Sequence, residues 1–109
     1  MAATQQRKKD LWAEVKRRLE AAYGDRLKGV VIYGSEATGR GGPDSDIDAM
    51  VLLDGPINLW DEIGRCVDAT YSLALEVGRP IHAEPVDAEE YEKADFALYR
   101  RAKAEGVLL

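Results

Sequence analysis

The sequence predicts a small α/β domain of the α+β kind, in which helices pack against a mixed sheet of about three to four strands. Two long segments carry apolar residues at helical spacing, and three short apolar runs are typical of buried strands. Clusters of glycine and proline separate these segments. A chain of 109 residues can form one hydrophobic core, so we expect a single domain over residues 1–109.

The first half of the chain contains a predicted helix, a predicted strand and an irregular segment. Residues 1–6 are expected to form a loose end, and a helix follows from about residue 7 to Tyr23, where Gly24 ends it. The apolar face of this helix is formed by Leu11, Trp12, Val15, Leu19 and Ala22. Residues 28–33 predict a buried strand. Residues 34–45 contain four glycines and one proline, too many for a regular element.

A long helix is predicted over residues 59–77, and Gly78 is a plausible stop. Its apolar residues form one broad stripe at helical spacing: Trp60, Ile63, Val67, Tyr71, Ala74 and Leu75. The simplest interpretation places Trp12, Trp60 and Tyr71 in the core. The alternative is that some of these stripes form an interface with another molecule, because a small domain has limited core to share.

Two strands and a final helix complete the predicted order. Residues 48–53 form the second strand and residues 80–86 the third. Asp87, followed three residues later by Glu90, resembles a capping box, so a last helix is expected to run to about Glu105 before Gly106.

Charge and composition exclude several classes of protein. The formal net charge is −5, from 15 Lys and Arg against 20 Asp and Glu, whereas broad electrostatic binding to nucleic acid needs a basic face. The single cysteine, Cys66, allows no internal disulfide and suits a reducing compartment. The sequence has no long apolar span and no signal-like start. We therefore expect a soluble cytoplasmic protein without a membrane segment.

The residues that point to chemistry lie on both sides of the glycine-rich segment. Gly34 and Ser35 directly follow a strand, and a backbone without side chains lets a phosphate approach closely. Asp46 and Asp48 are two positions apart, so on a strand they point to the same side and can share a divalent cation. The alternative interpretation is local, because Ser-Asp-x-Asp can also serve turns and helix caps.

The run Gly34-Ser35, a nine-residue spacer, Ser45-Asp46-Ile47-Asp48 and an apolar strand resembles the minimal nucleotidyltransferase (MNT) group of the DNA polymerase β-like nucleotidyltransferase superfamily. The resemblance implies the nucleotidyltransferase fold, a nucleoside triphosphate such as ATP, and two Mg²⁺ ions. By position, Gly34 and Ser35 would hold the β- and γ-phosphates, within a site that includes Ser45. Asp46 and Asp48 would be metal ligands.

The resemblance also implies a cation after the Gly-Ser pair and a third acid on the strand that follows the long helix. Arg40 is the nearest cation to the pair, because Glu36 and Thr38 stand where many relatives carry arginine. His82 falls on the usual acidic position, and Glu84, two residues further on the same face, is the candidate third metal ligand and base. His82 itself is either a base beside Glu84 or an ordinary strand residue.

The activity implied by this resemblance is transfer of a nucleoside monophosphate, most simply AMP from ATP, to a hydroxyl acceptor. MNT proteins commonly act as antitoxins that pair with helical HEPN-type toxins, so the resemblance implies a partner protein as acceptor. A second hypothesis is a degenerate fold that binds a partner without chemistry, motivated by Glu36 and Thr38. A third is an enzyme of the aminoglycoside type that works as a homodimer.

Overall fold

The computed structural model describes residues 2–109 of the chain, with side chains described from Gln6 onward. Its centre is a four-stranded sheet in the order β3-β2-β1-β4. β1 (Leu27–Tyr33) runs antiparallel to both β2 (Ile47–Leu53) and β4 (Val107–Leu108), and β2 runs parallel to β3 (Ile81–Asp87). The predicted mixed sheet with helices packed against it is therefore confirmed.

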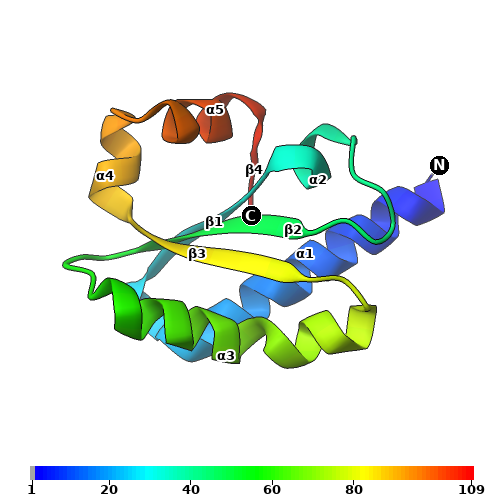
Figure 1. Cartoon of the computed structure of the whole chain (residues 1–109), viewed down its shortest axis with the longest axis horizontal. Helices are drawn as coiled ribbons and strands as arrows, with labels where there is room; N and C mark the ends of the chain where they lie inside the picture. Colours follow the sequence, from blue (N-terminus) through cyan, green and yellow to red (C-terminus); the bar gives the residue numbers. More distant parts are fainter. Residues whose placement is uncertain (1) are drawn as a thin grey trace.

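Helices cover both faces of this sheet (Figure 1). The long helices α1 (Ala2–Tyr23) and α3 (Leu59–Val77) pack on one face, and the short helices α4 (Ala88–Lys93) and α5 (Ala97–Glu105) lie on the other. The larger cluster of buried side chains includes Val15, Leu19, Ile32, Val51, Cys66 and Leu73. The smaller cluster, on the α4 and α5 side, comprises Val31, Met50, Leu52, Val86, Tyr91 and Ala102.

Strand β2 shows how the sheet presents its residues to the two layers. Ala49 and Val51 belong to the cluster under α1 and α3, whereas Met50 and Leu52 belong to the cluster under α4 and α5. Side chains alternate between faces along a strand, so Asp48 lies on the same face as Met50. Because both faces of the sheet are covered, β2 is an almost continuous apolar run, interrupted only at its second residue by the carboxylate of Asp48.

The N-terminal helix begins earlier than the sequence suggested. α1 starts at Ala2, so residues 2–6, which we expected to form a loose end, are helical, while Met1 lies outside the described residues. Alanine and glutamine in this stretch are compatible with helix, and no glycine or proline interrupts it. A 3₁₀ turn, η1 (Gly24–Arg26), then connects α1 to β1.

The glycine-rich segment is less irregular than predicted. Its first five residues form a short helix, α2 (Gly34–Thr38), which ends at Gly39 with a φ of 77°. Glycine adopts this left-handed conformation without steric cost, so Gly39 is a normal helix terminator. Most of the glycines and the proline of this segment follow Thr38, so the residues between Gly34 and Gly39 can form one short turn of helix.

The bounds predicted for the long helix are confirmed, but its orientation is not. α3 runs from Leu59 to Val77, with the Asn58 side chain accepting from the Asp61 N–H and Gly78 left-handed at its end. The predicted core positions Trp60 and Tyr71 are 83% and 60% exposed. The buried side is formed by Glu62, Cys66, Thr70 and Leu73. Within the described residues, no helix is both long and apolar enough to cross a membrane.

The predicted last helix is two helices. Asp87 caps α4, accepting from the N–H groups of Glu89 and Glu90, as the sequence suggested. The helix then stops at Ala94, which has a φ of 54°, and the Arg100 guanidinium donates to the carbonyls of Ala94 and Asp95. The chain returns through α5 to β4, a short strand that the sequence did not predict.

Candidate active site

Gly34 joins the two halves of the sequence motif. It follows β1 with a φ of 69°, and a Cβ added there would lie 2.9 Å from Oδ2 of Asp48. A side chain at position 34 is therefore disfavoured both by the backbone conformation and by the carboxylate. The start of α2 and the start of β2 thus meet at one point, where backbone without a side chain adjoins the Asp48 carboxylate.

Three strands contribute side chains to the surface around Asp48. Asp48 is paired with Tyr33 of β1 and with His82 of β3, and His82 Nδ1 lies 3.5 Å from Asp48 Oδ1. Glu84 is paired with Met50, one step further along the strand, and its carboxylate accepts a hydrogen bond of 3.3 Å from the Tyr33 hydroxyl. His82, not Glu84, is therefore the immediate neighbour of Asp48 on β3.

The Tyr33 hydroxyl is held in its protonated form. Burial raises its pKa, and the negative charges of Glu84 and Asp48 raise it further. Tyr33 can therefore donate to Glu84 throughout the physiological pH range. The sequence motif begins with this residue, but only the sheet register indicates that its hydroxyl reaches β3.

The turn between α2 and β2 folds back on itself. The backbone N–H groups of Arg40 and Gly41 donate to the Ser35 carbonyl, and the Ser45 hydroxyl donates to the Gly42 carbonyl. A Cβ on Gly41 would lie 2.6 Å from Ser45 Oγ and 3.2 Å from Ser35 Oγ. Ser35 and Ser45 are therefore brought to the two sides of Gly41. The Arg40 side chain is exposed to solvent.

Asp46 is exposed and lies between two anchored residues. The carbonyl of Ser45 accepts from Arg79 Nε at 3.0 Å, and the N–H of Ile47 donates to the carbonyl of Pro80 at 2.9 Å. The segment that carries Asp46 is thus held at both ends by the chain that follows α3. Two carboxylates two residues apart, one exposed and one half-buried, can both turn toward a cation at the Gly34 edge of the sheet.

Arg79 belongs to a buried cluster with Trp12 and Glu36, which we call the Glu36 cluster. Glu36 accepts from Trp12 Nε1 at 2.9 Å and from Arg79 Nη2 at 2.8 Å. The Glu36 side chain is 2% exposed and that of Arg79 12%. Burial alone would raise the pKa of Glu36, but hydrogen bonds from Arg79 and Trp12 and the charge of Arg79 outweigh it and hold the pKa below its usual value.

The Glu36 cluster connects the two halves of the motif through side-chain hydrogen bonds. Glu36 lies on α2, directly after Ser35, while Arg79 also holds the carbonyl before Asp46. Glu36 therefore anchors the segment between Gly34 and Asp48 to Arg79. Its buried carboxylate is not directed toward a phosphate. Sequence reasoning missed this role because Trp12 and Arg79 are 24 and 43 residues away from Glu36. A carboxylate among apolar and small residues was the only local signal.

Helix α5 closes one side of the Gly34 region. A cavity of about 180 Å³ is lined by Tyr33, Gly34 and the α5 residues Leu98, Arg101 and Glu105. Arg101 lies far from Gly34 in the sequence, but the return of the chain through α4 and α5 brings it to the same cavity. The region around Gly34 therefore adjoins a cation that the motif does not contain.

The donor set suits Mg²⁺ only when a ligand contributes further oxygens. Within the described part of the chain, no three or more His, Cys, Asp or Glu residues are grouped closely enough to hold a metal ion. Mg²⁺ is usually bound by one or two carboxylates together with phosphates and water, so Asp46 and Asp48 fit such a site. Gly34 carries no side chain, and the position that a Cβ would take lies 2.9 Å from Asp48 Oδ2, so bare backbone and a carboxylate stand side by side there. Bare backbone is what a phosphate group can approach closely.

Comparisons with known proteins identify the family and the fold. A family profile described as "Nucleotidyltransferase domain" matches residues 9–107. A solved structure described as "Crystal structure of the toxin-antitoxin with AMP-PNP" has a similar fold, with a TM-score of 0.57 and 20% sequence identity. The similarity covers 86% of this chain and 68% of that chain, and at this identity it concerns the fold alone. No curated protein sequence matches the chain.

Proposed function

The chain belongs to the nucleotidyltransferase domain family, and we propose that it is a Mg²⁺-dependent enzyme that transfers AMP from ATP to a hydroxyl group. The observation that carries this proposal is the close approach of the Asp48 carboxylate to Gly34. A phosphate bound at the Gly34 backbone would lie next to a cation held by Asp48, because Asp48 Oδ2 lies 2.9 Å from the position that a Cβ of residue 34 would take. Phosphate and metal in contact are what metal-assisted phosphoryl transfer requires.

We assign the binding roles as follows. Gly34 and Ser35 hold the β- and γ-phosphates, Ser45 braces the turn beside them, and Arg40 and Arg101 supply positive charge from two sides. Asp46 and Asp48 provide metal ligands. Bound Mg²⁺ would neutralise phosphate charge and polarise the bond that breaks. Neutralising the phosphate charge matters because the chain itself has a net charge of −5 and would repel a nucleoside triphosphate.

The chemical step needs a base on the β3 side of the site. The acceptor oxygen attacks the α-phosphorus, the bond from that phosphorus to the bridging oxygen breaks, and pyrophosphate leaves. We propose that Glu84 takes the acceptor proton, while Tyr33 donates to one of its oxygens and orients it. The position of His82 beside Asp48 makes it the alternative base. Activity of Glu84→Gln and His82→Gln variants distinguishes the two.

We propose that the acceptor is a tyrosine, serine or threonine hydroxyl on a helical partner of the HEPN type, with this chain as the antitoxin of the pair. The fold shared with the toxin–antitoxin structure supports this assignment. The free, buried Cys66 suits a reducing cytoplasm. The competing function is a binding module without chemistry, which the absence of a three-acid group among the described residues favours.

Calorimetric titration with ATP, with and without Mg²⁺, tests the proposed site. We expect binding that depends on Mg²⁺ and is lost in the Asp46→Asn/Asp48→Asn double variant. Asp44→Asn is the matched control, because Asp44 is an exposed acid two residues before Asp46. A folded wild-type chain that binds no ATP would contradict the proposal and favour the binding module.

Mass spectrometry of a co-expressed partner tests the reaction. We expect the partner to gain mass in units of AMP with the wild type and not with the double Asp variant. A partner that is neutralised but unmodified would exclude the catalytic role. Calorimetry would then still report whether the nucleotide site exists.

A further inference from the structure

One side of α3 presents an unusual row of apolar side chains to solvent. We call the row of Trp60, Ile63, Val67, Tyr71 and Leu75 the α3 stripe. Their exposed fractions are 83, 37, 51, 60 and 66%. The side of α3 that packs in the domain is a different one, formed by Cys66 and Leu73 with two polar residues. No contact within the described residues therefore requires the α3 stripe to be apolar.

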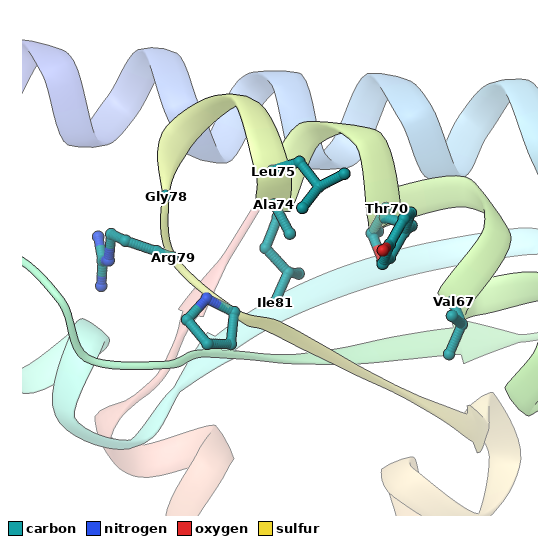
Figure 2. A pocket seen from close by; sticks show the side chains of 9 residues that line it. Val67, Thr70, Ala74, Leu75, Gly78, Arg79 and Ile81 are labelled. Carbon is teal, nitrogen blue, oxygen red and sulfur yellow. The ribbon is translucent and has the colours of Figure 1, made fainter.

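The α3 stripe continues into a groove between α3 and β3. Figure 2 shows Ala74 and Leu75 of α3 together with Ile81 at the start of β3 along this groove. It has a volume of about 460 Å³, and Val67 and Tyr71 also line it. β3 is an outer strand of the sheet, and α3 runs beside it (Figure 1).

The size of this surface matches that of a subunit interface. Large aromatic side chains present about 150–250 Å² each, so the exposed parts of Trp60 and Tyr71, together with the smaller exposed parts of the three aliphatic residues, amount to roughly 600 Å² per chain. Monomeric proteins rarely expose contiguous apolar patches of more than a few hundred Å². Two such surfaces in contact would bury about 1,200 Å², the lower limit for a stable specific interface.

The α3 stripe is also complementary to itself. Trp60 precedes Val67 by seven residues and Ala74 follows it by seven, which places each about 10 Å from Val67 along the helix. If two α3 helices cross antiparallel at Val67, each Trp60 meets the small Ala74 and the groove of the other copy. Ile63 and Tyr71, four residues before and after Val67, face each other in the same way. A two-fold interface requires this reciprocity.

We propose that the chain forms a homodimer through the α3 stripe, with each Trp60 inserted into the groove between α3 and β3 of the other copy. Gly64 lies on the exposed side of α3, and a Cβ there would contact nothing, so the helices can approach closely at the crossing. Asp48 faces the opposite side of the sheet, toward α4 and α5, so the dimer leaves both candidate active sites accessible. Buried tryptophan anchors commonly dominate such interfaces.

Sedimentation equilibrium tests the dimer. We expect wild type to approach twice the 12.0 kDa chain mass at micromolar concentration, and Trp60→Glu and Leu75→Glu to remain monomeric with unchanged circular dichroism. Leu108→Glu is the matched control, because Leu108 is 69% exposed but lies on β4 at the other edge of the sheet. A monomeric wild type, or a Trp60→Glu variant that still dimerises, would overturn the proposal.

Cross-linking tests the crossing point. Val67→Cys places a thiol at the two-fold axis, so oxidation should yield a disulfide-linked dimer. Arg17→Cys, on the exposed side of α1, should yield none, and wild type reports the contribution of Cys66, which is buried. If Val67→Cys cross-links no better than Arg17→Cys, α3 helices do not cross at this residue and the proposed geometry is wrong.

Discussion

Glu36 and Glu62 are both buried carboxylates that pair with an arginine, yet they occupy different surroundings. Glu36 contacts Arg79 at 2.8 Å, and the two side chains are 2% and 12% exposed. Glu62 contacts Arg26 at 2.6 Å, but the Arg26 side chain is 38% exposed. One pair lies under the candidate active site, and the other joins α3 to the turn before β1. Water can replace a partner in the second pair but not in the first.

The difference indicates which ion pair is coupled to function. Glu36 also accepts from Trp12, and Arg79 also donates to the carbonyl before Asp46, so each partner of this ion pair has a further hydrogen bond. Breaking this pair should move the motif loop. Breaking the Glu62–Arg26 pair should change local stability only.

The largest effect is expected from Glu36→Ala. It leaves the Arg79 guanidinium buried without its carboxylate, so the free energy of unfolding should fall by about 3 kcal/mol. The matched Glu62→Ala variant should lose about 1 kcal/mol, because Arg26 remains hydrated. Urea denaturation measures both. Equal losses in the two variants would show that the exposure of the arginine does not determine how much unfolding free energy is lost.

A smaller effect on stability, with a distinct effect on binding, is expected from Arg79→Lys. Arg79 reaches the Ser45 carbonyl with Nε and the Glu36 carboxylate with Nη2, and a lysine has one nitrogen in place of these two. We expect a loss of about 1–2 kcal/mol in stability and a roughly tenfold weaker affinity for Mg²⁺ and ATP.

Arg26→Lys is the control for this variant. It should bind ATP as wild type does, when calorimetry is done at a temperature where all proteins are folded. Wild-type affinity in Arg79→Lys would mean that Arg79 stabilises the fold without positioning Asp46.

Acid titration separates the charge of Glu36 from its packing. The folded pKa of Glu36 lies below the ordinary value of 4.5, so its charge contributes stability at neutral pH, and this contribution is lost as the pH falls through the folded value. Glu36→Gln should therefore show a shallower loss of unfolding free energy below about pH 4.5 than wild type. Parallel acid profiles for the two proteins would contradict a charged Glu36.

The smallest effect is expected from Trp12→Phe, which removes one hydrogen bond to Glu36 and keeps most of the ring packing. The expected loss in unfolding free energy is about 1 kcal/mol. Tyr23→Phe is the counterpart beside the second pair, because the Tyr23 hydroxyl donates to the Glu62 carbonyl. Its loss should be similar, but only Trp12→Phe should also weaken ATP binding in calorimetry.

Features with local causes could be predicted from the sequence. The bounds of α3 and the cap at Asp87 depend on residues within one turn of the helix end, where glycine or a short acceptor side chain acts on neighbouring backbone groups. The candidate site was partly predictable for the same reason. Gly34 and Asp48 lie in one short motif, so the sequence could bring them together before any fold was known.

Features that depend on distant residues could not be predicted. β4 pairs with β1 across most of the chain, and two residues carry too little pattern to indicate a strand. Both sides of α3 carry apolar residues, since Trp60 lies on the exposed side and Leu73 on the buried side. The spacing of apolar residues therefore could not indicate which side of α3 faces the sheet.

The sequence by itself determined the family, the mixed sheet and the motif that carries Gly34, Ser35, Asp46 and Asp48. Only the tertiary structure decided that His82 is the neighbour of Asp48, that Glu36 is an anchor, and that one apolar side of α3 is left in solvent. The physical reason is the range of the interactions. Turns and caps act over a few residues, whereas strand register, buried ion pairs and helix orientation are set by packing between segments far apart in the chain.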